Sequence, residues 1–76
     1  SRGLGDVYKR QFIDYITNLR ITKACQLLSD TTYTVAEICY TCGFNNLSNF
    51  IRTFKKKKAM TPNEYRVYLQ KMLIKY

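Results

Sequence analysis

Apolar residues recur at intervals of three and four positions along most of this chain, which is the spacing of one face of an α-helix. Glycine and proline, which interrupt helices, number only 3 and 1 among the 76 residues. No repeat or linker divides the chain, so the pattern predicts one all-α module. Residues 1–11 are the exception: they hold two of the glycines and no periodicity, and we expect an irregular lead-in there.

The first helix is predicted over residues 12–29 and has two apolar faces. When successive residues are placed about 100° apart, the two halves of the helix present apolar side chains in opposite directions. The first face consists of Phe12, Tyr15, Ile16 and Leu19, and the second of Ile21, Ala24, Cys25 and Leu28. Such a helix joins two subdomains, so the first face is expected to need a partner. Because Ile13 and Leu27 break the pattern, a helix buried nearly all round is the alternative.

Residues 34–58 contain two amphipathic segments joined at Gly43. Thr34 and Glu37 have the spacing of a capping box, which predicts a helix start, and glycine favours the left-handed conformation that ends a helix. The asparagines at 45–46 then supply an N-cap for a second, longer helix. This is the helix-turn-helix pattern, although spacing alone leaves an ordinary helical hairpin open.

The second helix of this pair separates its apolar and polar side chains. Phe50 and Phe54 form an i, i+4 pair that is expected to point into the core. The opposite side carries donors suited to phosphates and base edges, namely Ser48, Arg52, Lys55 and Lys56. Leu47 and Ile51 are ambiguous: they complete an apolar stripe with the phenylalanines, yet at its border they can touch thymine methyl groups. The lysines at 55–58 also fit solvated cations at a helix C-terminus.

A last helix is predicted over residues 62–75. Thr61 and Glu64 form another capping box, and Pro62 suits the first helical position. An apolar stripe follows at helical spacing, formed by Tyr65, Tyr68, Leu69, Met72, Leu73 and Tyr76. This stripe is either core or a docking surface.

Charge narrows the classes of function. Lys and Arg number 13 against 5 acidic residues, a formal net charge of +8, which favours a polyanionic partner such as nucleic acid or an anionic membrane surface. No apolar run is long enough for a membrane span and no signal-type segment is present, so we expect a cytoplasmic protein with no membrane partner. Without histidine or a phosphate-binding glycine loop, an enzyme is the least favoured class.

Two other binding functions stay open from the residues alone. A cationic amphipathic membrane-surface protein fits the charge and the amphipathic helices. A protein-interaction module fits the first apolar face of residues 12–29.

The cysteines Cys25, Cys39 and Cys42 do not suggest disulfides, because their number is odd and no secretory signal is present. Cys39 and Cys42 have C-x-x-C spacing, but a zinc site would want four ligands and no histidine is available. Both also fall on the apolar stripe of the helix that begins near Thr34. We therefore expect buried structural thiols, with no metal and no cofactor.

Several motifs at fixed spacing resemble the C-terminal half of the AraC/XylS family of bacterial transcription regulators. They are Y-x-x-x-L-R-I-x-x-A-x-x-L-L over residues 15–28, then T-V-A-E-I, then G-F-N-N-L-S-N-F-I-R-T-F-K-K, then T-P-N-E-Y-R. The resemblance implies a homeodomain-like bundle of about four helices, in which residues 12–76 are a partial DNA-binding domain. In the family two helix-turn-helix units are joined by a long helix and enter successive major grooves.

The resemblance also implies roles for individual residues. The recognition helix would be residues 46–57, and the function sequence-specific binding of double-stranded DNA in the major groove, regulating transcription in the bacterial cytoplasm at the nucleoid. RNA polymerase is a candidate further partner. The implied base contacts are Leu47, Ser48, Ile51 and Arg52, and the implied phosphate contacts are Asn46, Asn49, Lys55 and Lys56. A first helix-turn-helix unit, missing here, would pack on Phe12, Tyr15, Ile16 and Leu19.

Departures from the family pattern lead to further expectations. Residues 1–11 do not resemble the first unit, so the chain is expected to be a fragment or to carry a foreign start. The family favours glycine where Ala59 stands, and an alanine held at positive φ costs about 1 kcal/mol, so we expect a rearranged or weakened turn. It favours alanine at Cys39, a small difference that packing can absorb.

Overall fold

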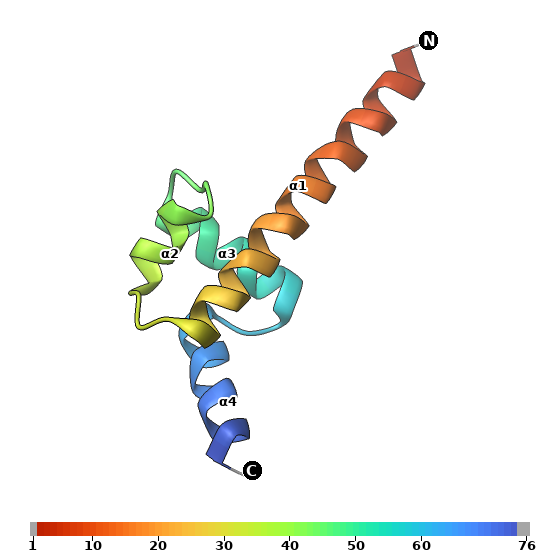
Figure 1. The fold of residues 1–76 in the computed structure, drawn as a ribbon. Coiled ribbons are helices and arrows are strands. Elements are labelled where there is room, and N and C mark those ends of the chain that lie inside the picture. The colour runs from red at the N-terminus through yellow and green to blue at the C-terminus, as the bar shows by residue number, and fades with distance from the viewer. Residues whose placement is uncertain (1, 75–76) are drawn as a thin grey trace.

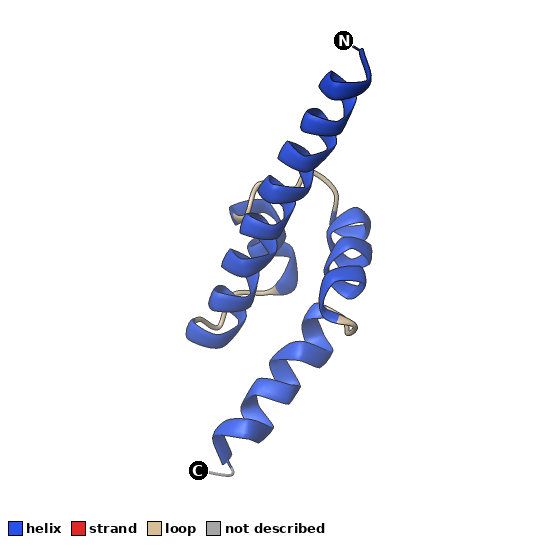
Figure 2. Cartoon of the chain, turned by 90° about the vertical axis from the view of Figure 1, so that its right-hand side faces the viewer, coloured by secondary structure: helices blue, strands red, loops and turns tan. Residues whose placement is uncertain are grey.

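The structure of the chain is a computed structural model that describes the backbone of residues 2–74 and the side chains of residues 9–72. Its helices are α1 (Arg2–Asp30), α2 (Val35–Thr41), α3 (Leu47–Lys58) and α4 (Pro62–Ile74). Residues 2–74 contain no strand, as Figure 2 shows. The predicted all-α bundle of about four helices is therefore confirmed.

The start of α1 differs from the prediction. The helix begins at Arg2, whereas we expected an irregular segment over residues 1–11, so that expectation is wrong for residues 2–11 and Ser1 lies outside the described residues. Each glycine in a helix costs about 1 kcal/mol relative to alanine. However, the segment contains no proline, and adding residues to an existing helix is far easier than starting one. The helix nucleated further along the chain therefore continues backwards through both glycines.

A core forms where α2, α3 and α4 gather around the second half of α1 (Figure 1). We call residues 20–30 the core segment of α1 and residues 2–19 its leading segment. Aromatic rings run through the core from Phe44 to Phe50 (centroids 5.0 Å apart), Phe54 (5.9 Å) and Tyr65 (5.5 Å). The buried members of the core are Ile21, Ala24, Leu28, Ile38, Cys39, Cys42, Phe44, Phe50 and Phe54. The second apolar face predicted for the first helix thus belongs to the core, with Cys25 partly buried beside it.

The N-terminal part of the leading segment of α1 extends away from the other helices, as Figure 1 shows. Phe12, Tyr15 and Leu19 on its first apolar face are exposed, Tyr15 by 62%, and Ile16 is half-buried. The prediction of two opposed faces is confirmed. Ile13 is 57% exposed, so the alternative of a helix buried nearly all round is wrong.

The predicted helix starts are present in the structure. The Thr34 hydroxyl accepts from the Glu37 N–H (3.1 Å), and a Glu37 carboxylate oxygen accepts from the Thr34 N–H (3.3 Å). The same exchange joins Thr61 and Glu64 at the start of α4, with distances of 3.2 and 2.9 Å. These reciprocal bonds satisfy N–H groups that a helix leaves free in its first turn.

Left-handed residues follow α2 and α3. Gly43 has φ +97° after α2, as predicted for a glycine that reverses the chain. Ala59 has φ +65° after α3, and its N–H donates to the Lys55 carbonyl at 2.8 Å. The turn therefore keeps the left-handed geometry that a glycine would favour, and the expected rearrangement does not occur.

The stripe predicted along α4 divides between core and surface. Tyr65 packs against the core and Leu69 is half-buried, whereas Tyr68 and Met72 are exposed. The side chains of Leu73 and Tyr76 lie outside the described residues, as does the predicted helix end at residue 75. Among the residues that the structure describes, no helix has the length and apolar character required to cross a membrane.

Candidate nucleic-acid interface

The orientation of α3 is determined by its first turn and its buried face. The Asn46 side-chain oxygen accepts from the Asn49 N–H at 2.9 Å, which caps the helix as predicted. Phe50 and Phe54 are fully buried and lie one turn apart, which ties that side of α3 to the core. The opposite side therefore faces outward along the length of the helix.

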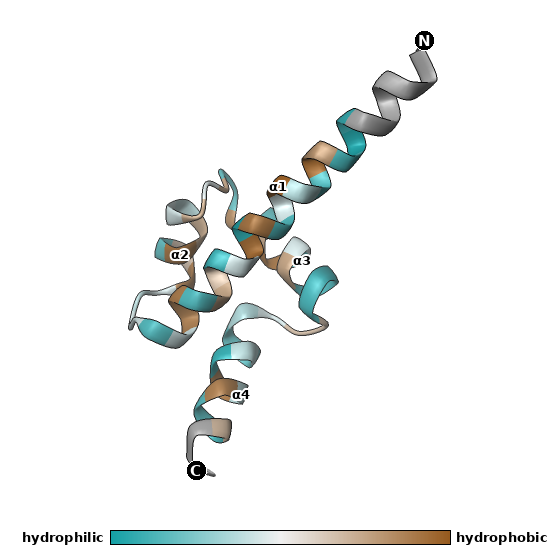
Figure 3. Ribbon diagram, turned by 45° about the vertical axis from the view of Figure 1, so that its right-hand side comes forward, coloured by the Kyte–Doolittle hydropathy of each residue, from teal (hydrophilic) through white to brown (hydrophobic). Residues whose placement is uncertain are grey.

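The outward side of α3 carries polar and cationic groups. Ser48 and Arg52 are exposed and lie one helical turn apart, and the exposed Lys55 and Lys56 follow near the C-terminus of the helix. Figure 3 shows the end of α3 as one of the hydrophilic parts of the molecule. Positive charge is favourable there because the helix dipole is negative at its C-terminus. The arrangement presents hydroxyl, guanidinium and ammonium donors on one accessible surface.

Leu47 and Ile51 lie at the border of this surface. Both are half-buried and pack against the core, as the helical spacing indicated. The structure thus assigns them a packing role. Their contact with bases, which the family resemblance implies, stays a prediction.

Asn46 and Asn49 are exposed but already hold local bonds. The side-chain oxygen of Asn46 serves as the helix cap, and that of Asn49 accepts from the Thr53 hydroxyl at 3.4 Å. Their amide NH₂ groups hold no bond among the described residues, and an NH₂ group is a donor suited to phosphate oxygens. Their phosphate contacts stay a prediction.

The turn between α2 and α3 is held by a residue that the sequence patterns did not single out. The Arg20 guanidinium lies 5.9 Å from the centroid of the Phe44 ring, within the range of a cation–π interaction. Arg20 also covers the turn closely, since a Cβ built on Gly43 would lie 3.3 Å from Arg20 Nε. Position 43 therefore favours glycine both for its φ and for space.

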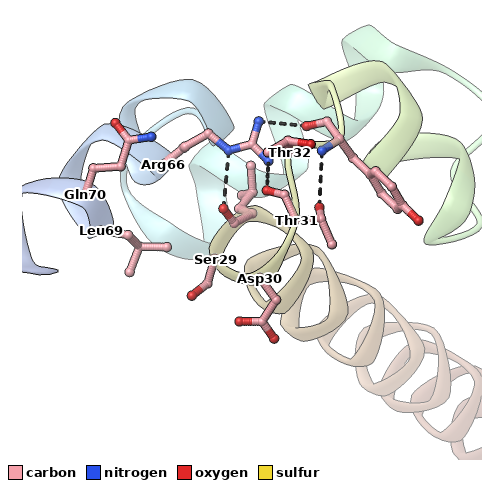
Figure 4. A pocket seen from close by; sticks show the side chains of 9 residues that line it. Ser29, Asp30, Thr31, Thr32, Arg66, Leu69 and Gln70 are labelled. Atoms are coloured by element: carbon pink, nitrogen blue, oxygen red, sulfur yellow. Dashed lines mark hydrogen bonds between the residues drawn. The ribbon is translucent and has the colours of Figure 1, made fainter.

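Arg66 is a second residue whose role the patterns missed. Its Nε donates to the Leu28 carbonyl (3.2 Å), and its two terminal nitrogens donate to the carbonyls of Tyr33 (2.7 Å) and Thr31 (3.2 Å). Figure 4 shows this guanidinium beside the C-terminal end of α1, with its hydrogen bonds drawn as dashed lines. These carbonyls lie 33 to 38 positions away in the sequence, so no local signal predicts the contact.

A cavity of about 650 Å³ lies beside the Arg66 guanidinium. It is lined by Leu28, Ser29, Asp30, Thr31, Thr32, Tyr33, Arg66, Leu69 and Gln70 (Figure 4). The Arg66 guanidinium that borders the cavity already donates to backbone carbonyls of the same chain. We therefore assign Arg66 to holding α4 on the α1–α2 loop.

Cys39 and Cys42 lie in the core, as predicted from the apolar stripe. Burial raises the pKa of both thiols above the usual value for cysteine. A thiol with a raised pKa is a poor nucleophile and a poor metal ligand at neutral pH. Within residues 9–72, no group of three or more cysteine, histidine or acidic side chains is arranged to hold a metal ion.

Comparison with known families and proteins places this arrangement among regulators. Residues 1–67 match a family model described as a helix-turn-helix domain. The melibiose operon regulatory protein of Escherichia coli is 44% identical over 52 residues, which cover 68% of this chain and 17% of that protein. The transcriptional activator RhaS of Mannheimia succiniciproducens is 37% identical over 71% of this chain and 20% of its own length. The chain thus spans about a fifth of these relatives.

A solved structure has the same fold. It is the C-terminal domain of the two-component response regulator yesN from Fusobacterium nucleatum, with a TM-score of 0.74 and 37% sequence identity. The match covers 87% of this chain and 69% of that one. The arrangement over most of this chain is therefore already known from a solved structure.

Proposed function

Because the chain belongs to the AraC-type helix-turn-helix domain family, a family of transcription regulators, we propose that it binds double-stranded DNA sequence-specifically and regulates transcription as part of a longer protein. In this proposal α3 lies in the major groove and α2 supports it. Arg52 and Ser48 read base edges, and Lys55 and Lys56 bind phosphates. The major groove of B-form DNA accommodates one α-helix, and α3 exposes a side that carries Ser48, Arg52 and lysines.

The observation that carries the proposal is the division of α3 into two sides. Phe50 and Phe54 are fully buried, so the helix cannot turn its exposed side inward without dismantling the core. Arg52, one turn from Ser48, is then free to present two parallel donors to a guanine. Leu47 and Ile51 supply apolar contact at the edge of the same surface.

Selection of bound duplexes from a random pool at two ionic strengths tests the proposal. We expect one enriched sequence that persists at the higher ionic strength, because base contacts depend less on salt than phosphate contacts do. A pool that binds at low salt without enrichment would leave only charge attraction. That result would contradict the readout by α3.

Two matched substitutions on α3 separate the proposed roles. Arg52→Ala should weaken binding to the enriched duplex by about 1–3 kcal/mol and relax the preference at one base pair. Lys56→Ala should weaken binding to all duplexes alike and reduce the salt slope by about 1. Unchanged preference in the Arg52 variant would show that this residue does not read bases.

The exposed first face of α1 supports a further part of the proposal. We propose that Phe12, Tyr15, Ile16 and Leu19 pack against a preceding helix-turn-helix unit, and that RNA polymerase is a further partner of the whole regulator. Phe12, Tyr15 and Leu19 are each at least half exposed, and exposed apolar clusters mark interaction sites. In the isolated chain this face should cause self-association at high concentration, relieved by Leu19→Asp. Sedimentation would detect the difference.

If the protein instead acted at a membrane surface, its helices would form only on binding lipid, so its helicity would depend on anionic vesicles. The described helices bury an internal core, with Phe50, Phe54 and Ile38 fully enclosed, which supports a protein that folds without a lipid surface. Helicity unchanged on adding vesicles would agree with the DNA-binding proposal.

A further inference from the structure

The lysines at the end of α3 are not equivalent. Lys57 Nζ lies 2.8 Å from Asp14 Oδ1, which joins the end of α3 to the leading segment of α1. The side chain of Lys57 is only 27% exposed, whereas that of Asp14 is 64% exposed. Among residues 9–72, Lys55, Lys56 and Lys58 form no ion pair. One cation of the run is therefore already paired within the protein.

Asp14 also lies within the field of a neighbouring lysine. The hydrogen bond from Lys57 and the charge of Lys57 lower the pKa of Asp14, and the charge of Lys56 lowers it further. Of the other described carboxylates, Glu37 and Glu64 cap helices. Asp14 thus places a negative charge beside the lysines that the proposed function assigns to DNA phosphates.

The ion pair between Lys57 and Asp14 affects the positive charge available to DNA more than it affects the stability of the fold. Pairs between exposed side chains contribute little to stability, because water and salt screen them. A lysine held by a carboxylate, however, does not neutralise a phosphate unless the pair breaks. If it breaks, the freed carboxylate repels the same phosphate.

We propose that Asp14 limits the binding of this domain to the DNA backbone by holding Lys57 away from phosphates. The inference rests on the proposed function and extends it: α3 and its surroundings contain a residue that weakens binding to every sequence alike. The number of phosphates neutralised is then set by two helices together, α3 through its lysines and α1 through its carboxylate.

The test is Asp14→Asn, measured with a random-sequence duplex across a range of salt concentrations. Release of Lys57 to one phosphate should strengthen binding and steepen the slope of log K against log salt by about 0.9. The advantage over the unaltered chain should therefore shrink about 3.5-fold between roughly 50 and 200 mM salt. The base preference from duplex selection should stay the same, because no base contact changes.

Matched variants distinguish the pairing from a general loss of negative charge. In a Lys57→Gln background, Asp14→Asn should no longer steepen the slope. Asp30→Asn removes the same charge at the C-terminal end of α1, sixteen positions from Asp14, and should leave the slope unchanged. Circular dichroism and melting curves check that every variant is folded.

An unchanged slope in Asp14→Asn, or the same gain with Lys57 replaced, would overturn the proposal while DNA binding itself stands. A chain that binds no duplex at any ionic strength would instead contradict the proposed function, and this inference with it.

Discussion

The leading and core segments of α1 have the same apolar content but opposite surroundings. Residues 9–19 and residues 20–30 each contain five apolar side chains in eleven positions. In the core segment Ile21, Ala24 and Leu28 are buried, whereas in the leading segment Phe12 and Tyr15 are more than half exposed. What differs is the direction in which the apolar positions point relative to α2, α3 and α4.

The comparison shows that helix formation and burial of an apolar face have different causes. Helix formation follows from local sequence, and α1 runs through both segments without a break. Burial follows from the partner that a face meets, and no described helix covers Phe12 or Tyr15 of the leading segment. Amphipathic periodicity thus predicts a face that needs a partner, without saying which chain or domain provides it.

Matched truncations in the two regions should give the largest contrast. Phe50→Ala removes a fully buried ring that contacts Phe44 and Phe54, and should lower the free energy of unfolding by about 3–5 kcal/mol. Leu19→Ala in the leading segment should change it by less than about 0.5 kcal/mol. Urea denaturation followed by circular dichroism measures both.

The size of this contrast matters because the domain is small. A chain of 76 residues is expected to have a total stability of roughly 4–11 kcal/mol. Phe50→Ala should therefore populate the unfolded state. A comparable loss in Leu19→Ala would show that the leading segment is packed in solution.

Arg66 should give the next largest effect, because it joins the end of the core segment to α4. Arg66→Ala removes bonds to the carbonyls of Leu28, Thr31 and Tyr33, and should cost about 2 kcal/mol. Arg66→Lys keeps the charge but lacks the planar fork of donors, so it should recover less than half of the loss. Arg52→Ala, on the exposed side of α3, is the control and should leave stability nearly unchanged.

Local signals account for much of this fold. The capping boxes at Thr34 and Thr61, the cap at Asn46 and the left-handed Gly43 each depend on residues within a few positions, so spacing was enough to predict them. The prediction of an irregular start for α1 is wrong because it treats the glycines at positions 3 and 5 as helix breakers. Elongation of a helix already formed outweighs their modest cost.

Contacts between distant segments were beyond reach of the patterns. Arg66 meets its carbonyls, and Asp14 meets Lys57, only after the helices pack. For the candidate interface, spacing alone predicted the exposure of Ser48 and Arg52. Leu47 shows the limit, because the same stripe fits both core packing and base contact until its partner is known.

Substitutions in the two turns that flank α3 should change the stability of the domain by smaller amounts and in opposite directions. Ala59 has φ +65°, so Ala59→Gly should relieve strain and stabilise the domain by about 0.5–1 kcal/mol after the entropy gained by the unfolded chain is subtracted. Gly43→Ala should destabilise it by more than about 1 kcal/mol, because φ is +97° and the Arg20 side chain covers the turn. Thermal melts of both variants test the signs. Equal signs would mean that the two turns do not share this geometry in solution.

The smallest expected effect is the loss of stability at low pH. It tests whether the leading segment of α1 unfolds together with the rest of the domain. Hydrogen bonds and the charge of Lys57 lower the pKa of Asp14, and bonds from Thr61 lower the pKa of Glu64. A carboxyl whose pKa is lower in the folded state adds stability above its unfolded pKa, and this stability is lost as pH falls through the folded pKa. The melting temperature should therefore decline as the pH falls below the ordinary pKa values of these carboxyl groups, 3.8 for aspartate and 4.5 for glutamate. Glu64→Gln should flatten the decline because Glu64 caps α4, a helix that packs on the core. Asp14→Asn should flatten it only if the leading segment unfolds together with α3. A decline unaffected by Asp14→Asn would mean that this end of α1 opens on its own while the core stays folded.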